Sequence, residues 1–318
     1  MIQRRAVTYT LGAALIGLSG FAQAQAQTQE IYIPLVSKGF QHQFWQAVKS
    51  GAEQAAKDLK VKVTFEGPET EAMVDKQIDM LAAALAKKPQ AIGFAALDSQ
   101  AAIPLLKKAK AAKIPVVAFD SGVDSDIPVT TTTTNNKAAA ALAADKMAEM
   151  IGKSGEVALV VHDQTSRTGV DRRDGFVNRI QSTYPNIKIV SVQYGGGDQL
   201  KSTEITKSIL QASPNLKGIF GANEGSAIGV VNGVKEMKRT GKVVIIGYDS
   251  GKQQKNAIMD GSMAGAITQN PVGMGYKTVE MAVKAIKGEK LPKVVDTGFF
   301  WYDKTNIADP QIAAVLYD

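Results

Sequence analysis

The chain has 318 residues, of which 45% are hydrophobic and 21% are charged, and its formal net charge is +7. These values are typical of a globular protein long enough for two domains, and they exclude a chain that is disordered over most of its length. Cysteine is absent, which excludes a disulfide scaffold and a cysteine nucleophile. The lysines are spread over the backs of expected helices, so we expect no nucleic-acid partner despite the basic balance.

Residues 1–24 are predicted to be a signal peptide. Arg4 and Arg5 form its positive start, residues 11–21 are apolar, and residues 22–24 (Ala-Gln-Ala) match a small-x-small cleavage site. The ordinary secretory route fits better than the twin-arginine route, because the Ala-Val-Thr after the arginines matches that signal poorly. The sequence offers no lipid-anchor cysteine and no later run of roughly 20 apolar residues. We therefore expect a soluble protein of a bacterial periplasm.

The first predicted elements alternate between strands and helices. Residues 31–36 read as a buried parallel strand, and apolar residues at helical spacing follow over residues 44–59. Further strands are predicted at residues 61–66, 91–97 and 116–119, with helices from residue 73 to about 85 and from near Pro104 to about 113. Pro104 is placed at the first turn or a bend of its helix, since deeper in a helix it would remove a hydrogen bond. This series predicts a parallel sheet with right-handed crossovers.

Residues 129–136, VTTTTTNN, interrupt the series with consecutive β-branched threonines. They form either an edge strand or a link between two domains, and the link fits because the series then starts again. Strands are predicted at residues 156–162, 187–193, 218–222 and 242–248, and helices at 138–151, 170–182, 201–212 and 227–237. Residues 265–270 and 299–302 are interpreted as two later crossings, on either side of a helix at 273–287.

The predicted fold is therefore α/β, with two Rossmann-like lobes that contain parallel sheets and are joined by a three-segment hinge. The first lobe is expected to comprise residues 28–134 and 270–297, and the second lobe residues 135–269 and 298–318. In such an arrangement the carboxyl ends of the strands line a cleft between the lobes, where open α/β sheets bind their ligands.

Polar and aromatic residues gather at these predicted strand ends. They are Phe44, Trp45, Asp120, Arg172, Arg173, Asn223, Asp249 and Gln269. Carboxylates, amides and a guanidinium can bind vicinal hydroxyls, while an aromatic face covers the C–H side of a sugar ring. Each residue alone has a simpler explanation: the aspartates could cap the turns of their Asp-Ser-Gly sequences, Arg172 could pair with a neighbouring aspartate, and one of the two aromatics could only pack its helix. The repetition at equivalent positions in both halves favours a ligand cleft.

The segments IFGANEGSAIG, VVIIGYDSG, AGAITQNP and the GEK turn resemble periplasmic sugar-binding proteins of the ribose-binding type, which serve ABC importers. The resemblance covers about residues 31–287. It implies a type I periplasmic binding protein that closes on a monosaccharide without chemistry, with an inner-membrane ABC permease and also a chemoreceptor as partners, and a monomeric state. It implies ligand contacts at His42, Phe44, Trp45, Asp120, Ser121, Asn136, Arg172, Asn223, Tyr248, Asp249 and Gln269, with Asn136 near the hinge.

Three residues depart from the pattern of this family. Ser121 stands where the family has an arginine, His42 where it has an asparagine, and Gly197 where it has a phenylalanine. Ser121 lacks the hydrogen-bond donors of the arginine, and Gly197 lacks the aromatic side chain that would form a wall of the pocket. Both differences make ribose a less favoured ligand. They favour a wider pocket that accepts a hexose or a sugar alcohol.

An enzymatic function has little support in the sequence. Two histidines and no cysteine leave no His-rich metal site, and the sequence from Gly273 resembles a dinucleotide fingerprint but has Thr278 in place of the third glycine. We expect no catalytic residues, no cofactor and no metal. The alternatives that stay open are a receptor for a non-sugar polyhydroxy signal and, less favoured, a carbohydrate-active enzyme. We do not expect a sugar-responsive repressor, because such repressors need a DNA-binding headpiece and the N-terminus here is predicted to be a signal peptide.

Overall fold

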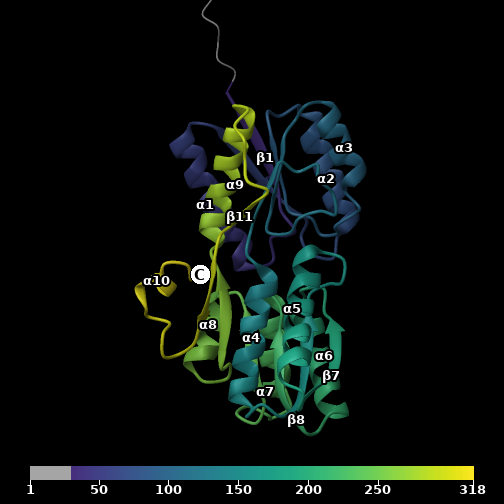
Figure 1. Ribbon diagram of the computed structural model, residues 1–318, viewed down its shortest axis with the longest axis vertical. Coiled ribbons are helices and arrows are strands. Elements are labelled where there is room, and N and C mark those ends of the chain that lie inside the picture. The colour runs from purple at the N-terminus through teal and green to yellow at the C-terminus, as the bar shows by residue number, and fades with distance from the viewer. Residues whose placement is uncertain (1–29) are drawn as a thin grey trace, which may run out of the picture. The chain divides into compact units, whose positions relative to one another are not determined.

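The computed structural model describes residues 30–318, and residues 31–318 form one compact unit. The predicted signal peptide, residues 1–24, lies outside the described residues. The first sheet has only parallel neighbours. Its strands follow the order β2 (Lys62–Glu66), β1 (Tyr32–Val36), β3 (Ile92–Phe94), β4 (Val116–Phe119), β5 (Thr130–Thr133) and β11 (Val294–Asp296) (Figure 1).

The second sheet repeats this order with later strands. It runs β7 (Ile187–Tyr194), β6 (Gly155–Val161), β8 (Leu216–Gly221), β9 (Val244–Tyr248), β10 (Gly265–Gln269) and β12 (Phe299–Tyr302). All neighbours are parallel except β10 and β12, which are antiparallel. The prediction that the second half of the chain repeats the architecture of the first is confirmed.

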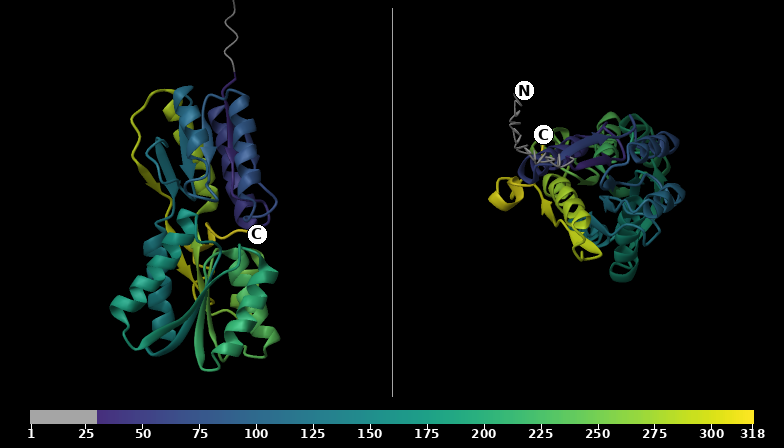
Figure 2. Two further views of the ribbon diagram at one scale, coloured as in Figure 1. Left: turned by 90° about the vertical axis from the view of Figure 1, so that its right-hand side faces the viewer. Right: turned by 90° about the horizontal axis from the view of Figure 1, so that it is seen from above.

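Helices cover both faces of each sheet (Figure 2). The first sheet carries α1 (Gln43–Leu59) and α9 (Pro271–Ile286) on one face, and α2 (Val74–Ala86) and α3 (Ile103–Ala111) on the other. The second carries α4 (Asn136–Met150) and α5 (Arg167–Thr183) on one face, and α6 (Gln199–Ala212), α7 (Glu224–Glu236) and α8 (Lys252–Met259) on the other; α10 (Pro310–Ala313) follows near the C-terminus. We call each sheet with its helices a lobe.

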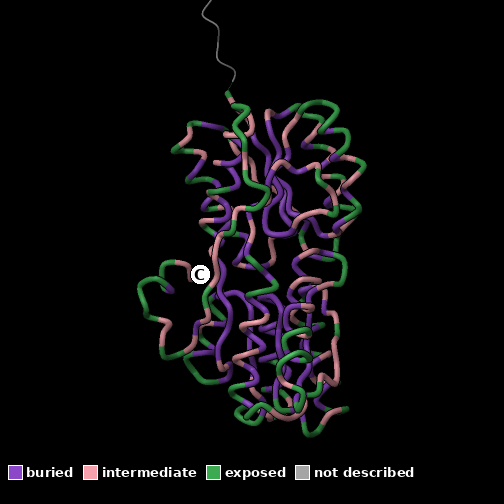
Figure 3. Tube along the Cα trace, in the orientation of Figure 1, coloured by how far each residue is buried: buried purple, intermediate pink, exposed green. Residues whose placement is uncertain are grey.

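Each face of each sheet has its own hydrophobic core, so the strands are buried from both sides (Figure 3). This explains why the strands read as continuous apolar runs. Pro104 lies in the first turn of α3, as predicted. Glycines allow α1 and α9 to approach closely: a Cβ on Gly51 would lie 1.9 Å from the Val272 carbonyl oxygen, and one on Gly275 the same distance from that of Val48.

The threonine-rich segment differs from one of its two interpretations. β5 lies between β4 and β11, so it is an interior strand and the edge-strand interpretation is wrong. α9 bonds to one of the buried threonines of β5: the hydroxyls of Thr132 and Thr278 lie 2.6 Å apart. Beyond β5 the chain does pass into the second lobe, as the other interpretation expected.

The chain crosses between the two lobes next to the two segments that were interpreted as later crossings, and not within those segments. Gly265–Gln269 form β10 inside the second sheet, and the chain returns to the first lobe only after it, through Asn270 into α9. β11 ends the first sheet, and the third crossing is the short step from β11 to β12. Sequence periodicity did not indicate α8, α10 or β11, which are short and partly exposed. The predicted residue boundaries of the lobes stay a prediction.

Candidate ligand-binding site

The carboxyl ends of strands from both sheets surround a cavity of about 250 Å³. Its lining consists of Lys38, His42, Phe44, Trp45, Glu71 and Asp120 from the first lobe, and His162, Thr168, Arg172, Asn223, Asp249 and Gln269 from the second. The cavity thus gathers seven of the eight residues proposed from strand ends, together with His42. Arg173 is not in the lining and instead bonds to Asp174 and Tyr194.

Two aspartates reach the cavity from equivalent places. Asp120 follows β4 and Asp249 follows β9, each within an Asp-Ser-Gly sequence. Both have left-handed backbones, with φ of 54° and 82°, which aspartate adopts more readily than most residues. Neither side chain caps its own turn: Asp249 accepts hydrogen bonds from the Glu224 amide at 2.9 Å and from Gln269 Nε2 at 2.7 Å. The repeated sequence therefore aims one carboxylate from each lobe into the cavity.

Asp120 is the less satisfied of the two carboxylates. Within residues 30–318 its side chain accepts no hydrogen bond, and its nearest cation is Nη2 of Arg172, 4.0 Å from Oδ1. Burial raises the pKa of Asp120 to about 6, although Lys38 and Arg172 oppose the shift. A buried carboxylate without donors is costly, so ligand hydroxyls would supply bonds that the protein leaves unmade.

Arg172 is held in place by groups that lie behind the cavity wall. Its Nε donates to Asn136 Oδ1 at 2.8 Å and its Nη1 to the Ala222 carbonyl at 2.9 Å, and its guanidinium carbon lies 3.7 Å from the centre of the Tyr248 ring. The Tyr248 hydroxyl donates to the same Asn136 oxygen at 2.9 Å. Only Nη2 of the guanidinium is left to face the cavity.

Three residues that the resemblance implies as ligand contacts lie outside the cavity lining. Asn136 Oδ1 accepts from Arg172 and from the Tyr248 hydroxyl, and Asn136 Nδ2 donates to the Thr134 carbonyl at 3.0 Å, so these polar atoms are bonded within the protein. Ser121 is fully buried, and its hydroxyl has no hydrogen-bond partner. Their expected direct contact with a ligand is not supported by their placement.

The aromatic pair contributes to the cavity with both rings. Phe44 and Trp45 meet edge to face, with ring centres 4.9 Å apart, and both are almost fully buried. Trp45 Nε1 donates to Glu71 Oε1 at 2.7 Å, which fixes the indole orientation. Stacking of either ring on a sugar stays a prediction.

Four lining residues were missed by the sequence reasoning: Lys38, Glu71, His162 and Thr168. Lys38 and His162 come shortly after β1 and β6. Both could have been found by the expectation that residues at the carboxyl ends of strands line the cleft. Lys38 is 2% exposed, and its Nζ reaches Thr168 Oγ1 in the other lobe at 3.2 Å and Glu71 Oε2 at 3.9 Å. Glu71 lies in the irregular loop between β2 and α2, where no periodicity marks it.

The charges around the cavity are mixed, with more carboxylates than cations. Burial raises the pKa of Asp249 above its ordinary value and would also raise that of Glu71, but Lys38 and nearby groups hold the Glu71 pKa below its usual range. Burial together with Lys38 lowers the pKa of His162 to about 3, so its ring is neutral at pH 7. Two cations thus face three carboxyl groups, which disfavours an anionic ligand.

The space beside Gly197 is not open. A Cβ built there would lie 3.0 Å from Asn223 Nδ2, 3.2 Å from Glu71 Oε2 and 3.3 Å from His42 Nε2, and φ is 68°. Polar side chains from both lobes therefore occupy the region where an aromatic wall was expected to be missing. The expectation of a pocket widened at Gly197 is wrong.

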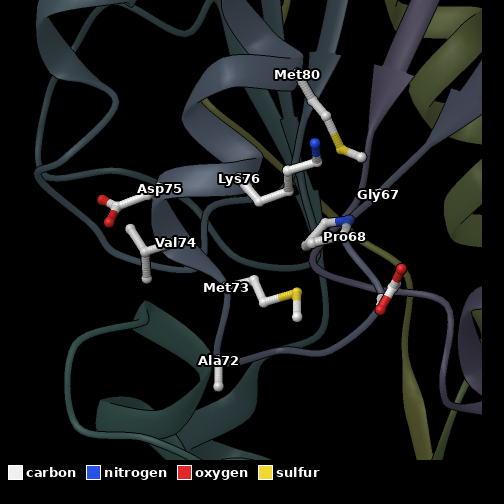
Figure 4. A pocket seen from close by; sticks show the side chains of 9 residues that line it. Gly67, Pro68, Ala72, Met73, Val74, Asp75, Lys76 and Met80 are labelled. Atoms are coloured by element: carbon white, nitrogen blue, oxygen red, sulfur yellow. The ribbon is translucent and has the colours of Figure 1, made fainter.

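A larger hollow of about 940 Å³, open to solvent, lies outside this site (Figure 4). It is formed by the loop after β2 and the start of α2, where Met73, Lys76 and Met80 gather around it. Its lining comes from one lobe and lacks converging buried polar groups, so it is a poorer site for a polar small molecule.

In residues 30–318 no helix is long and apolar enough to cross a membrane, and no cluster of three or more His, Cys, Asp or Glu side chains is arranged to hold a metal ion.

Comparisons with known proteins agree with this geometry. The D-allose-binding periplasmic protein of Escherichia coli (strain K12) is 28% identical over 293 residues, which cover 89% of this chain and 91% of that protein. A carbohydrate transporter solute-binding protein from Agrobacterium radiobacter, solved with D-arabinose, is 33% identical with a TM-score of 0.87, over 91% of this chain and 99% of that one. An ABC transporter solute-binding protein from Agrobacterium vitis, solved with D-fucose, is 34% identical with a TM-score of 0.87. The match covers 90% of this chain and 100% of that one. The family model described as a periplasmic binding protein domain matches residues 33–290, and the chain belongs to that family.

Proposed function

We propose that this protein captures a neutral monosaccharide or sugar alcohol between its two lobes in the periplasm and presents it to the permease of an ABC importer. The observation that carries the proposal is the enclosed cavity that takes one carboxylate from an equivalent strand end of each lobe, beside Arg172 and two aromatic rings. Such a set binds the hydroxyls of a ring or open chain from both sides. We expect the receptor to act as a monomer, with a chemoreceptor as a further partner.

Relatives support a monosaccharide as the ligand class. Their names or titles specify D-allose, D-apiose, D-ribose, D-arabinose, D-fucose and α-D-tagatopyranose, which include both pentoses and hexoses. The excess of carboxyl groups over cations at this cavity fits a neutral compound of that kind. It argues against a sugar acid or an amino acid.

A ligand panel tests the function directly. Thermal shift and calorimetric titration with D-ribose, the sugars named above, four- to six-carbon alditols and one sugar acid are expected to find a hexose or alditol that binds about tenfold tighter than ribose, or about 1.4 kcal/mol. The reason is that Ser121 removes arginine donors, while Lys38 and Glu71 place other polar groups at the cavity. A saturating ligand stabilises the folded protein by about 2.7 kcal/mol at a hundredfold excess over its dissociation constant.

The panel has two contrary outcomes. Tightest binding of ribose would show that the loss at Ser121 is compensated elsewhere. Stabilisation by no neutral sugar or polyol would overturn the proposed ligand class and favour a receptor for a different signal. Turnover of any glycoside by the purified protein would instead favour the carbohydrate-active enzyme.

Ligand is expected to close the lobes. The contacts across the cavity, such as Lys38 with Thr168, describe the closed arrangement, and a ligand that touches both lobes favours it over an open one. Small-angle X-ray scattering should give a smaller radius of gyration with the tightest sugar of the panel than without it. Equal values would mean that the protein is already closed or that it binds on one lobe only.

A further inference from the structure

Helix α1 begins without a cap from its own lobe. Its N-cap residue, His42, makes no side-chain capping bond, so the first amides of the helix need acceptors from elsewhere. Glu224 of the second lobe supplies them: the amides of Gln43 and Phe44 donate to its two carboxylate oxygens, each at 3.0 Å. A carboxylate at a helix N-terminus is stabilised both by these bonds and by the helix dipole.

A second helix is capped in the opposite direction. The N-cap residue of α8 is Gly251, which has no side chain to offer. Gln43 of the first lobe extends its Oε1 to the Lys252 amide of α8 at 2.8 Å. Each lobe therefore caps a helix of the other, and Gln43 takes part in both contacts.

This pair of contacts adjoins the cavity but does not line it. Neither Glu224 nor Gln43 belongs to the cavity lining. The Glu224 amide donates to Asp249 at 2.9 Å, and the Tyr317 hydroxyl, near the C-terminus, lies 3.4 Å from Glu224 Oε2. Glu224 is 3% exposed, and the amides of Gln43 and Phe44 from the first lobe lie against its carboxylate.

We propose that Glu224 and Gln43 form a reciprocal capping latch that holds the lobes closed and thereby sets the affinity for the ligand without touching it. They are positioning residues, and the proposal rests on the proposed function for its link to sugar affinity. A ligand that is retained by the closed form binds more weakly when that form is less populated. When the lobes open, water can bond to the freed amides of α1 and α8, so the latch favours closure without being required for the fold of either lobe.

Three variants weaken the latch by different means. Glu224→Ala removes the cap of α1, and Gln43→Ala removes the cap of α8. Gly251→Ala acts as a wedge, because its Cβ would lie 2.9 Å from Gln43 Oε1 and 3.0 Å from Glu224 Cδ, while the backbone of Gly251 has an ordinary φ of −58°. The matched control is Glu236→Ala, at the other end of α7, where the carboxylate only pairs with Lys207 at the surface.

The first readout needs no ligand. Because the chain has no cysteine, dyes can be placed at Gln54→Cys on α1 and Gln211→Cys on α6, both exposed, for single-molecule energy transfer. The ratio of closed to open molecules is expected to fall about tenfold in Glu224→Ala, as for the loss of a helix cap, and to stay unchanged in the control. Denaturant unfolding should show that the variants remain folded.

The second readout is the affinity for the tightest sugar of the panel, which should weaken in each latch variant in proportion to the fall in its closed fraction. A closed fraction and an affinity equal to those of the Glu236→Ala control would overturn the latch. If no sugar binds the unaltered protein while the closed fraction of Glu224→Ala still falls, the latch stands and the proposed function fails. If sugars bind and the closed fraction does not change, the latch fails and the proposed function stands.

Discussion

Arg172→Ala is expected to abolish sugar binding and to lower the free energy of unfolding by about 3–5 kcal/mol, the usual cost of removing one partner from a buried charged network. Alanine would leave the Asn136 side-chain oxygen and the Ala222 carbonyl without their donor, and Asp120 without its nearest cation. The side chain thus supports the interior of the second lobe as well as the cavity. Urea denaturation without ligand measures the first effect, and calorimetric titration with the tightest sugar measures the second.

The neighbouring Arg173→Ala is the control for this variant. Arg173 pairs with Asp174 and Tyr194 at the surface, where such contacts contribute roughly 0–1 kcal/mol, so both readouts should stay close to those of the unaltered protein. If Arg172→Ala unfolded at the same urea concentration as Arg173→Ala, the hydrogen bonds behind the cavity would not be supporting the lobe. If it retained sugar affinity, the guanidinium would not be part of the site.

Asp120→Asn is expected to lose sugar binding, as Arg172→Ala does, but without a loss of stability. Sugar affinity should fall by about one to two decades, because a charge-assisted hydrogen bond to a ligand hydroxyl contributes roughly 1.5–3 kcal/mol. The ligand-free protein at pH 7 should be as stable as the unaltered one or more stable by up to about 2 kcal/mol, since a desolvated charge without donors is removed. Asp249→Asn should not show this gain, because Asp249 already accepts two protein hydrogen bonds.

The dependence of stability on pH gives a separate check on Asp120. Burial raises its pKa to about 6 in the folded protein, above the ordinary value of 3.8, so the folded state binds this proton more tightly than the unfolded state. Between these two values the unfolded chain holds fewer protons, and stability therefore decreases as the pH rises from about 4 to about 6. The decrease should be smaller in Asp120→Asn. Identical pH profiles for the two proteins would show that Asp120 is not desolvated in solution.

The doubled α/β fold was predictable because the inner strands of the two sheets are buried on both faces and the covering helices bury apolar residues against them. Those patterns are local, and they survive in the sequence. The expectation that residues at the carboxyl ends of strands line the cleft also located the cavity, since Asp120 and Asp249 follow their strands directly. The interior place of β5 was not predictable, because it depends on pairing with β11, a short strand far along the chain.

Glu71 and Glu224 show where local patterns fail. Glu71 lies in an irregular loop, and only the meeting of Trp45, Lys38 and Asn223 around it gives it a role. Glu224 stands in the first turn of α7, where an acidic residue is ordinarily explained by the dipole of its own helix. That it caps α1 instead follows from the contact between the lobes, which no spacing in the sequence encodes.

The return of the chain through α9 fixes the order in which the protein can be completed. Every strand of the second sheet except β12 lies in one unbroken stretch, whereas the first sheet waits for α9 and β11 from near the end of the chain. α1 and α9 pack backbone against backbone at Gly51 and Gly275 and share one face of the first sheet, so α1 alone covers that face until those last segments arrive. During synthesis, the middle of this chain can reach its native structure before its beginning does.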